Sequence, residues 1–275
     1  MTTVAEVFVG LGGGIIVVAT VLSAVQTLAV PRAIPILITR WVFQALRVVL
    51  ELITRWTADY RRRDRIMALY APFGLLALPV AWLTLVLGGF MMIDWSLGIQ
   101  PWRRAFTESG SSLFTLGFLA PRDLPTTATA FIEASLGLGL LALLISYLPA
   151  IYGSYSRREI MVTTLETQAG SPPSAAEMLE RLARIGGLST LDQMWREWAR
   201  WFGDIEETHT SAPSLVFFRS PQPDRSWVTA AGAVLDAASI VSSALDQPRQ
   251  PEAELCVRAG YLSLRRIADF FAMPY

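Results

Sequence analysis

The sequence contains no lysine, one cysteine and one histidine, so all 23 of its basic residues are arginines. A lone cysteine, Cys256, cannot form a disulfide within the chain, and this favours a reducing compartment around it. One cysteine and one histidine, His209, are also too few for a zinc site, which takes about four such ligands. The all-arginine set is typical of a high-GC genome and indicates a bacterial source.

Motifs of catalysis are missing as well. No GxSxG, Walker, GxGxxG or CxxC pattern is present, so no local pattern supports an enzyme. The formal net charge is zero, and no run of interleaved arginines and aromatic residues marks a nucleic-acid surface. We therefore expect neither an enzyme nor a nucleic-acid-binding protein, and we expect no cofactor and no bound metal.

Charge is scarce and apolar residues are abundant. Charged residues make up 17% of the chain, hydrophobic residues 53%, and the mean hydropathy is +0.42. The apolar residues gather in three blocks, Val7 to Val30, Ala71 to Ile93 and Ala128 to Leu148, each near the length of about 20 residues that crosses a bilayer. The first block lacks a basic leader and is too long for a signal peptide. The sequence predicts an all-α membrane protein with about three transmembrane helices.

Arginines between the first two apolar blocks predict the topology. By the positive-inside rule this stretch is cytoplasmic, so the N-terminus lies outside and the connection from Asp94 to Thr127 lies on the outer side. The third block then returns the chain to the cytoplasm, and we expect a multi-pass protein of the cell membrane with a cytoplasmic tail. The arginines are Arg32, Arg40, Arg47, Arg55, Arg61, Arg62, Arg63 and Arg65.

Within that stretch, residues 34–57 predict an amphipathic helix. Arg40, Arg47 and Arg55 recur on one face and apolar residues such as Val42 occupy the other. The helix either crosses the membrane or lies in its inner interface. Because three arginines on one stripe are costly in lipid, the interface is favoured.

The chain after the third block predicts a soluble helical domain. It follows a Gly-Ser-Pro-Pro linker and shows helical patterns over Ala175 to Ile185, Leu191 to Ile205, Val228 to Leu245 and Glu252 to Phe271. Aromatic residues at helical spacing, Trp195, Trp198, Trp201 and Phe202, are more typical of a core than of a cofactor site. The sequence is thus divided into an N-terminal span (1–30), a basic segment (31–69), a channel-like domain (70–158) and a tail domain (159–275).

Residues Thr208 to Asp224 predict a long loop that contains His209. We interpret His209 as a loop residue without a catalytic role. Since its ordinary pKa is near neutrality, it is also a candidate pH sensor.

The outer connection carries the most informative motif. A stretch too short to span the membrane is followed by a glycine-bearing turn and then by a span, which is the order of a re-entrant pore helix and filter. At Thr115-Leu116-Gly117-Phe118 the sequence resembles the filter of the potassium channel family, Thr-Val-Gly-Tyr-Gly, and the resemblance extends from Ala71 to Arg158. It implies that Thr115, Leu116, Gly117 and Phe118 line the narrowest path, with Ser112 at the end of the pore helix.

One filter position departs from the family. Leu119 stands where the filter has its second glycine, and glycine permits a backbone geometry that leucine adopts only with strain. The departure predicts weak discrimination of potassium from sodium. Early in the third span, Glu133 is either an ion ligand, a carboxylate near the outer interface, or a group bonded to the pore helix. Gly137 and Gly139 either let the helix bend or permit close packing.

Two functions follow from these features. One is a cation channel for potassium or sodium, a homotetramer because one pore loop per chain supplies a quarter of a filter, with the tail as an assembly or gating domain. The alternative is a non-conducting membrane scaffold that keeps the pore-domain fold and binds partners through its cytoplasmic tail.

Overall fold

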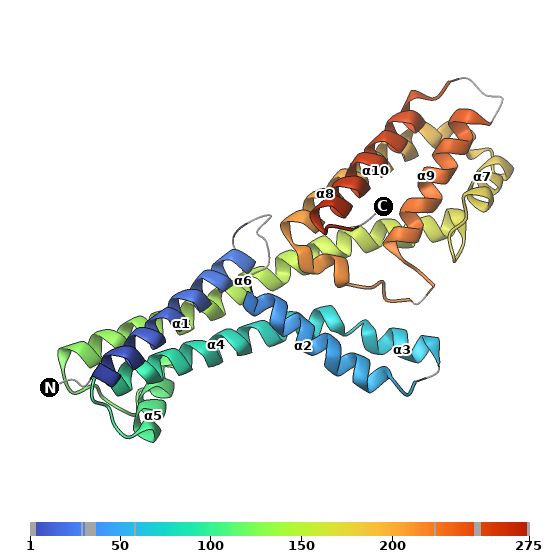
Figure 1. Cartoon of the computed structure of the whole chain (residues 1–275). Coiled ribbons are helices and arrows are strands. Elements are labelled where there is room, and N and C mark those ends of the chain that lie inside the picture. The colour runs from blue at the N-terminus through green and yellow to red at the C-terminus, as the bar shows by residue number, and fades with distance from the viewer. Residues whose placement is uncertain are drawn as a thin grey trace. The chain divides into compact units, whose positions relative to one another are not determined.

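The computed structural model describes residues 4–28, 30, 37–57, 59–222, 224–244 and 249–273, and this part of the chain is helical, without strands (Figure 1). It divides into two compact units. The N-terminal unit comprises Met1–Ile53 and Pro72–Pro149, and the C-terminal unit comprises Thr54–Ala71 and Ala150–Tyr275. A border predicted from the sequence, between residues 30 and 31, adjoins residues 31–36, which lie outside the described part.

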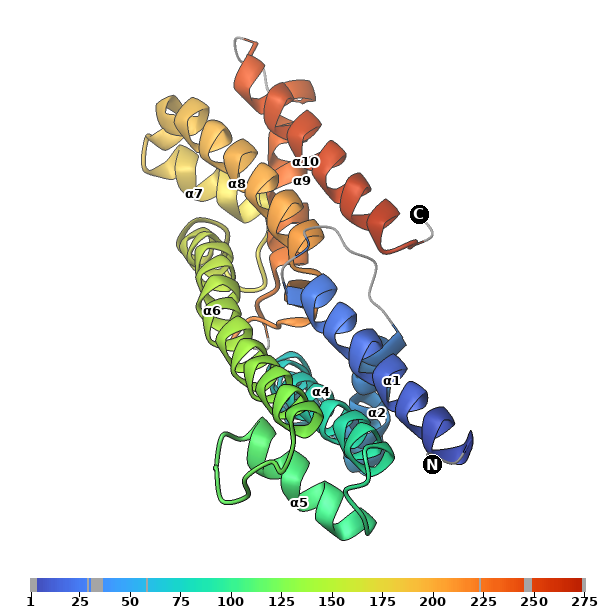
Figure 2. The ribbon, with the colours of Figure 1, turned by 90° about the vertical axis from the view of Figure 1, so that its left-hand side faces the viewer.

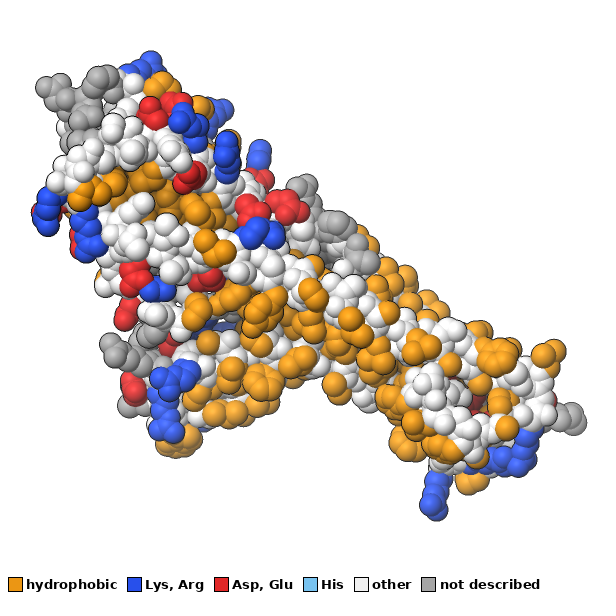
Figure 3. All heavy atoms as spheres, turned by 180° about the vertical axis from the view of Figure 1, so that it is seen from behind, with side chains coloured by type: hydrophobic (Ala, Val, Ile, Leu, Met, Phe, Trp, Pro, Cys, Tyr) orange, Lys and Arg blue, Asp and Glu red, His pale blue; other side chains and the backbone are white. Residues whose placement is uncertain are grey.

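Three helices are long and apolar enough to cross a membrane, as the sequence predicts: α1 (Val4–Leu28), α4 (Tyr70–Ser96) and α6 (Leu124–Ala169). They indicate a multi-pass membrane protein. Phe8, Ile15 and Phe131 are among the large apolar side chains that they leave exposed, and Figure 3 shows such side chains gathered over this unit. Lipid solvates these side chains, whereas water would not.

Helices α1 and α4 approach each other at glycines. A Cβ atom placed on Gly13 would meet the carbonyl oxygen of Gly89, so only glycine allows this separation of the backbones. Nearby, the buried Trp82 donates its Nε1–H to the hydroxyl of Ser23 at 3.3 Å. Small residues that permit close contact are the usual basis of helix packing in lipid.

The predicted amphipathic helix is present as α2 (Leu37–Thr54). Its polar face carries an exposed ion pair between Arg47 and Glu51 at 2.7 Å. The ring of Phe43, also on α2, packs against Gly74 of α4, where it occupies the place of a Cβ atom. Among the described residues, α2 is not one of the helices that meet the length and hydropathy needed to span. Its position at the membrane interface stays a prediction.

The C-terminal unit contains α3 (Tyr60–Met67), the second part of α6, and four further α-helices close to the predicted ranges. These are α7 (Ala175–Arg184), α8 (Leu191–Ser211), α9 (Trp227–Ser243) and α10 (Pro251–Phe270), with 3-10 turns at Gly187–Thr190 and Pro213–Phe217. Helix α10 lies along α8 (Figures 1 and 2). The core between the helices includes Trp195, Trp198, Trp201 and Phe202 as predicted, together with Cys256.

The loop predicted from Thr208 is wrong in its first part, because α8 continues to Ser211 and Pro213–Phe217 forms a 3-10 turn. Ile205, Thr208 and His209 continue the buried face of the helix at helical spacing. The hydroxyl of Thr208 donates to the carbonyl oxygen of Asp204 at 2.7 Å, which lets a polar residue stay in the helix. The polar sequence at the end of α8 predicts a loop, but burial of these side chains in the tertiary structure extends the helix to Ser211.

Candidate functional site: a buried carboxyl cluster

A short helix joins the last two spans, as the sequence predicts. Helix α5 (Trp102–Leu113) lies at the end of the N-terminal unit where α4 ends and α6 begins (Figure 2). Its 12 residues measure about 18 Å, too short to cross a bilayer. At its start Trp102 stacks on Trp95 at the end of α4, with ring centroids 4.9 Å apart.

Three carboxyl groups are buried where these helices meet. Asp94 of α4 is 3% exposed, Glu108 of α5 is 6% exposed and Glu133 of α6 is 1% exposed. They act on one another electrostatically, Glu108 on Asp94 and Asp94 on Glu133. Residues that are up to 39 positions apart in the sequence thus form one acidic cluster.

Hydroxyl groups complete the cluster. Ser109 Oγ donates a hydrogen bond to Glu133 Oε1 and lies 3.2 Å from the carbonyl oxygen of Leu87. Thr129 Oγ1 donates to the carbonyl oxygen of Thr126 at 2.9 Å and lies 3.4 Å from Asp94 Oδ1. In the described part of the chain no arginine forms an ion pair with Asp94, Glu108 or Glu133.

Acidic groups without basic partners are costly inside an apolar unit. Burial and mutual repulsion both disfavour the ionised forms, and each ionised group would be stabilised by a proton or a cation. Ionisable residues inside membrane helices face cavities or partners and commonly mark ion or proton paths. The cluster is therefore the candidate functional site, able to bind cations or protons through oxygen atoms.

The structure places two predicted residues at this site. Glu133 accepts a hydrogen bond from Ser109 of α5, and its role as an ion ligand stays a prediction. Gly137 packs against the end of α5, since a Cβ atom there would meet the carbonyl oxygen of Leu113. Gly139 has no neighbour within 4 Å of such an atom, and Ser112 is half-buried on α5.

Asp94 and Glu108 were missed by the sequence reasoning. Asp94 directly follows an apolar block, and Glu108 is a single acid in the short helix. Both positions are ordinary for a surface carboxylate. The only available signal was an acidic residue in each of the three segments that a span–short helix–span arrangement brings together.

The predicted filter segment forms the end of α5. Leu116 N–H donates to the carbonyl oxygen of Ser111 at 2.8 Å, and Thr115 N–H donates to that of Ser112 at 3.0 Å. This pair of bonds is a Schellman motif, with Thr115 at the left-handed position and a φ of 54°. That conformation is uncommon for a β-branched residue, and it leaves Leu116 and Phe118 exposed in the isolated chain, while Leu119 is half-buried.

A pore helix attracts cations when the free carbonyl groups at its C-terminal end point toward the pore axis. The Gly110, Ser111 and Ser112 carbonyl oxygens accept hydrogen bonds from the backbone of residues 114–116. A carbonyl group engaged in this way offers less of its partial charge to an ion. In this conformation the Asp94, Glu108 and Glu133 carboxyl groups are the stronger candidates for cation binding.

His209 lies in the buried face of α8 and not in a loop. Its Nδ1 is 2.8 Å from the carbonyl oxygen of Ile205, so Nδ1 carries the proton and Nε2 accepts from Arg158, 3.3 Å away. Burial, and then the charge of Arg158, lower the pKa of His209 to about 3. The imidazole is neutral at physiological pH, so the near-neutral pKa on which the sensor prediction was based does not hold in this structure.

Comparisons with protein families, with curated proteins and with solved structures found no match to this chain. The resemblance of Thr115-Leu116-Gly117-Phe118 to the potassium channel filter therefore stays a prediction. Function is inferred here from the buried site itself.

Proposed function

We propose that this chain is one subunit of an oligomeric, cation-permeable membrane protein. Its conducting part is the α4–α5–α6 arrangement of span, short helix and span, and its tail serves assembly or gating. The observation that carries the proposal is the cluster of Asp94, Glu108 and Glu133, buried and without a basic partner in the described residues.

The cluster suits a cation path for a chemical reason. Carboxylate and hydroxyl oxygens replace water around a monovalent cation, and rings of acidic side chains select cations in membrane pores. A homo-oligomer would repeat the three acids around its axis and multiply the field. Because carboxylates bind both ions, and because Leu119 replaces a filter glycine, we expect weak preference for potassium over sodium.

A flux assay on the full chain in liposomes tests the proposal. The purified protein should carry potassium and sodium at similar rates, and the large cation N-methylglucamine should not pass. Glu133→Gln keeps the shape of the side chain and its bond to Ser109 but removes the charge, and it should lower the flux about tenfold or more. Glu197→Gln, which changes a carboxylate on α8 outside the cluster, is the matched control and should leave the flux unchanged.

The assay tests the role of the carboxyl cluster separately from the conducting function of the whole protein. Flux no greater than that of protein-free liposomes would reject the conducting function. Equal flux in the wild type and in Glu133→Gln would reject the role of the cluster and would leave the Thr115 to Leu119 segment as the selective element.

The non-conducting scaffold is the second candidate, and the end of α5 favours it. The capped carbonyl groups of Ser111 and Ser112 and the leucine at position 119 each weaken a filter. An oligomer that is stable in detergent but carries neither ion in liposomes would support the scaffold. In that case partners should be sought for the tail.

A further inference from the structure

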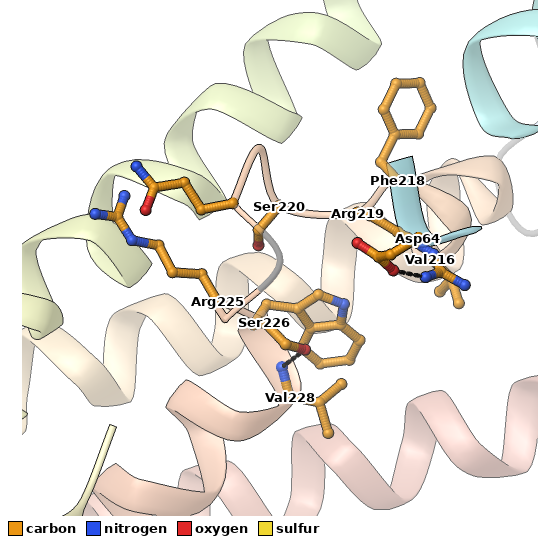
Figure 4. A pocket seen from close by; sticks show the side chains of 10 residues that line it. Asp64, Val216, Phe218, Arg219, Ser220, Arg225, Ser226 and Val228 are labelled. Atoms are coloured by element: carbon orange, nitrogen blue, oxygen red, sulfur yellow. Dashed lines mark hydrogen bonds and ion pairs between the residues drawn. The ribbon is translucent and has the colours of Figure 1, made fainter. Parts of the chain in front are cut away.

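A pocket of about 280 Å³ lies within the C-terminal unit (Figure 4). Its wall is formed by the end of the 3-10 turn and the segment after it, by the start of α9 and by Asp64 of α3. The volume is many times the roughly 30 Å³ of one water molecule and close to the lower limit of about 300 Å³ for small-ligand sites. It can hold a small organic molecule.

The start of α9 contributes a helix N-terminus to this pocket. Ser226 is the N-cap of the 17-residue helix, and its hydroxyl accepts from the N–H of Val228 at 3.2 Å. Ser226, Trp227 and Val228 all line the pocket. The aligned peptide dipoles place about half a positive charge at such an end and favour an anion there.

Two buried donors without partners also belong to this pocket. Ser220 is 8% exposed, and its hydroxyl has no hydrogen-bond partner. Arg225 Nε is buried and likewise unpartnered, although the guanidinium binds Glu166 and Thr163 through its other nitrogens. Figure 4 shows the Ser220 hydroxyl directed into the space between Arg225 and the start of α9. A buried donor without an acceptor is costly, and a bound acceptor would remove that cost.

The charges of the pocket point to a negative ligand. Arg219 and Arg225 line it; they pair with Asp64 and Glu166, and of these two carboxylates only Asp64 lines the pocket. The unpartnered atoms, Ser220 Oγ–H and Arg225 Nε–H, can both donate. The helix end and the arginines favour the same sign of charge.

We propose that this pocket binds a small oxyanion, the phosphate or carboxylate group of a compact molecule. Ser220 and Arg225 donate hydrogen bonds to its oxygen atoms, and the N-terminus of α9 stabilises its charge. Arg219 is held at the rim by Asp64, which limits how much negative charge the site accepts. The site is separate from the carboxyl cluster and does not depend on the proposed cation flux.

Inorganic phosphate is the probe for the test. The full chain is placed in nanodiscs of neutral lipid, and phosphate binding is followed by phosphorus NMR line broadening and by isothermal titration. We expect saturable binding that Ser220→Ala weakens about tenfold, the usual effect of losing a hydrogen bond to a charged group. Asp64→Asn should instead tighten binding, because it removes the competing carboxylate.

Control variants make the result specific. Arg258→Gln removes one positive charge from an exposed position on α10 and should leave binding unchanged. Arg225→Gln should abolish binding, and an unchanged circular dichroism spectrum will show that it is folded. If it does not fold, Ser220→Ala and Asp64→Asn decide the question, since neither removes the pair of Arg225 with Glu166.

Two outcomes overturn the proposal. One is the absence of saturable phosphate binding in the wild type. The other is binding that Ser220→Ala and Arg258→Gln affect equally, which would indicate adventitious attraction to surface arginines. A parallel arm with phosphatidic acid in the nanodiscs identifies the source of the oxyanion: a lipid headgroup in the pocket would compete with phosphate in the wild type but not in Ser220→Ala.

Discussion

Both units bury charge among apolar helices, but they treat it differently. In the C-terminal unit Arg158 is 0% exposed, yet it donates to the carbonyl oxygens of Leu215 and Phe218 at 3.1 and 2.7 Å. It also donates to Glu159 and His209. In the N-terminal unit Glu133 is equally buried but accepts a bond from a single hydroxyl and is acted on by the carboxyl group of Asp94.

This contrast separates a structural charge from a functional one. A buried arginine whose donors are all used holds its partners in place, here the 3-10 turn that precedes Phe218. A buried acid without a basic partner weakens the unit that contains it, and such features persist where activity requires them. We infer that Arg158 serves the fold and that the carboxyl cluster serves the function.

The two units also pack in different ways. Trp195 and Phe202 fill the C-terminal core with large aromatic rings, as expected where water drives apolar groups together. The N-terminal unit brings α1 and α4 together at Gly13 and Gly89, because lipid supplies no such force and helices associate by close contact.

Loss of Arg158 tests the structural side of the comparison and should have the largest effect. Arg158→Ala leaves Glu159 and two carbonyl groups buried without their donor, and we expect a loss of about 3–5 kcal/mol in the free energy of unfolding. Chemical unfolding of the full chain in detergent, followed by tryptophan fluorescence, measures it. The neighbouring Arg157, exposed and 3.7 Å from Asp204, provides the control, and Arg157→Ala should cost less than about 1 kcal/mol. Equal losses would remove the distinction.

Enlarging a glycine tests the packing difference. Gly13→Leu would push a side chain into the backbone of α4 at Gly89, and we expect a loss of about 1–3 kcal/mol, as for other overpacked sites. Thermal unfolding in detergent micelles gives the shift. Gly14→Leu, at a position with nothing within 4 Å, should change the midpoint little, and a similar shift for both variants would argue against close α1–α4 contact.

Acid should weaken the C-terminal unit through His209. Its folded pKa of about 3 lies below the unfolded value of about 6.5, so the unfolded state binds the extra proton. The contribution is present above about pH 6.5 and is lost as the pH falls toward 3, with a slope of up to about 1.4 kcal/mol per pH unit. Unfolding should be measured from about pH 8 to about pH 4, a range that begins above the unfolded pKa and ends near the folded one. The wild type should show this slope. His209→Gln should flatten it, and a pH dependence that the variant does not alter would contradict the assignment.

Neutralising Glu133 should produce the smallest change, and of opposite sign. Glu133→Gln keeps the bond from Ser109 and removes the cost of ionising a buried carboxyl group, so we expect a gain of up to about 1 kcal/mol. The same variant should lose cation flux. Thermal unfolding beside the flux assay reports both quantities, and a variant that loses stability would show that the charge supports the fold.

The elements that depend on local pattern were predictable. The three spans α1, α4 and α6 follow from the lengths of their apolar runs, and α2 and the four tail helices follow from helical periodicity. The aromatic core around Trp195 follows from the same spacing. These features need only neighbours within one helix, so the sequence by itself determined them.

Tertiary structure decided the rest. Glu133 was recognisable as an acid in a span, but Asp94 and Glu108 became its companions only when α4, α5 and α6 met. In the same way, burial placed His209 in a helix beside Arg158, 51 positions away, and left Ser220 without a partner. Periodicity reports which face of a helix is apolar, whereas the distance between groups far apart in the chain depends on how those faces pack.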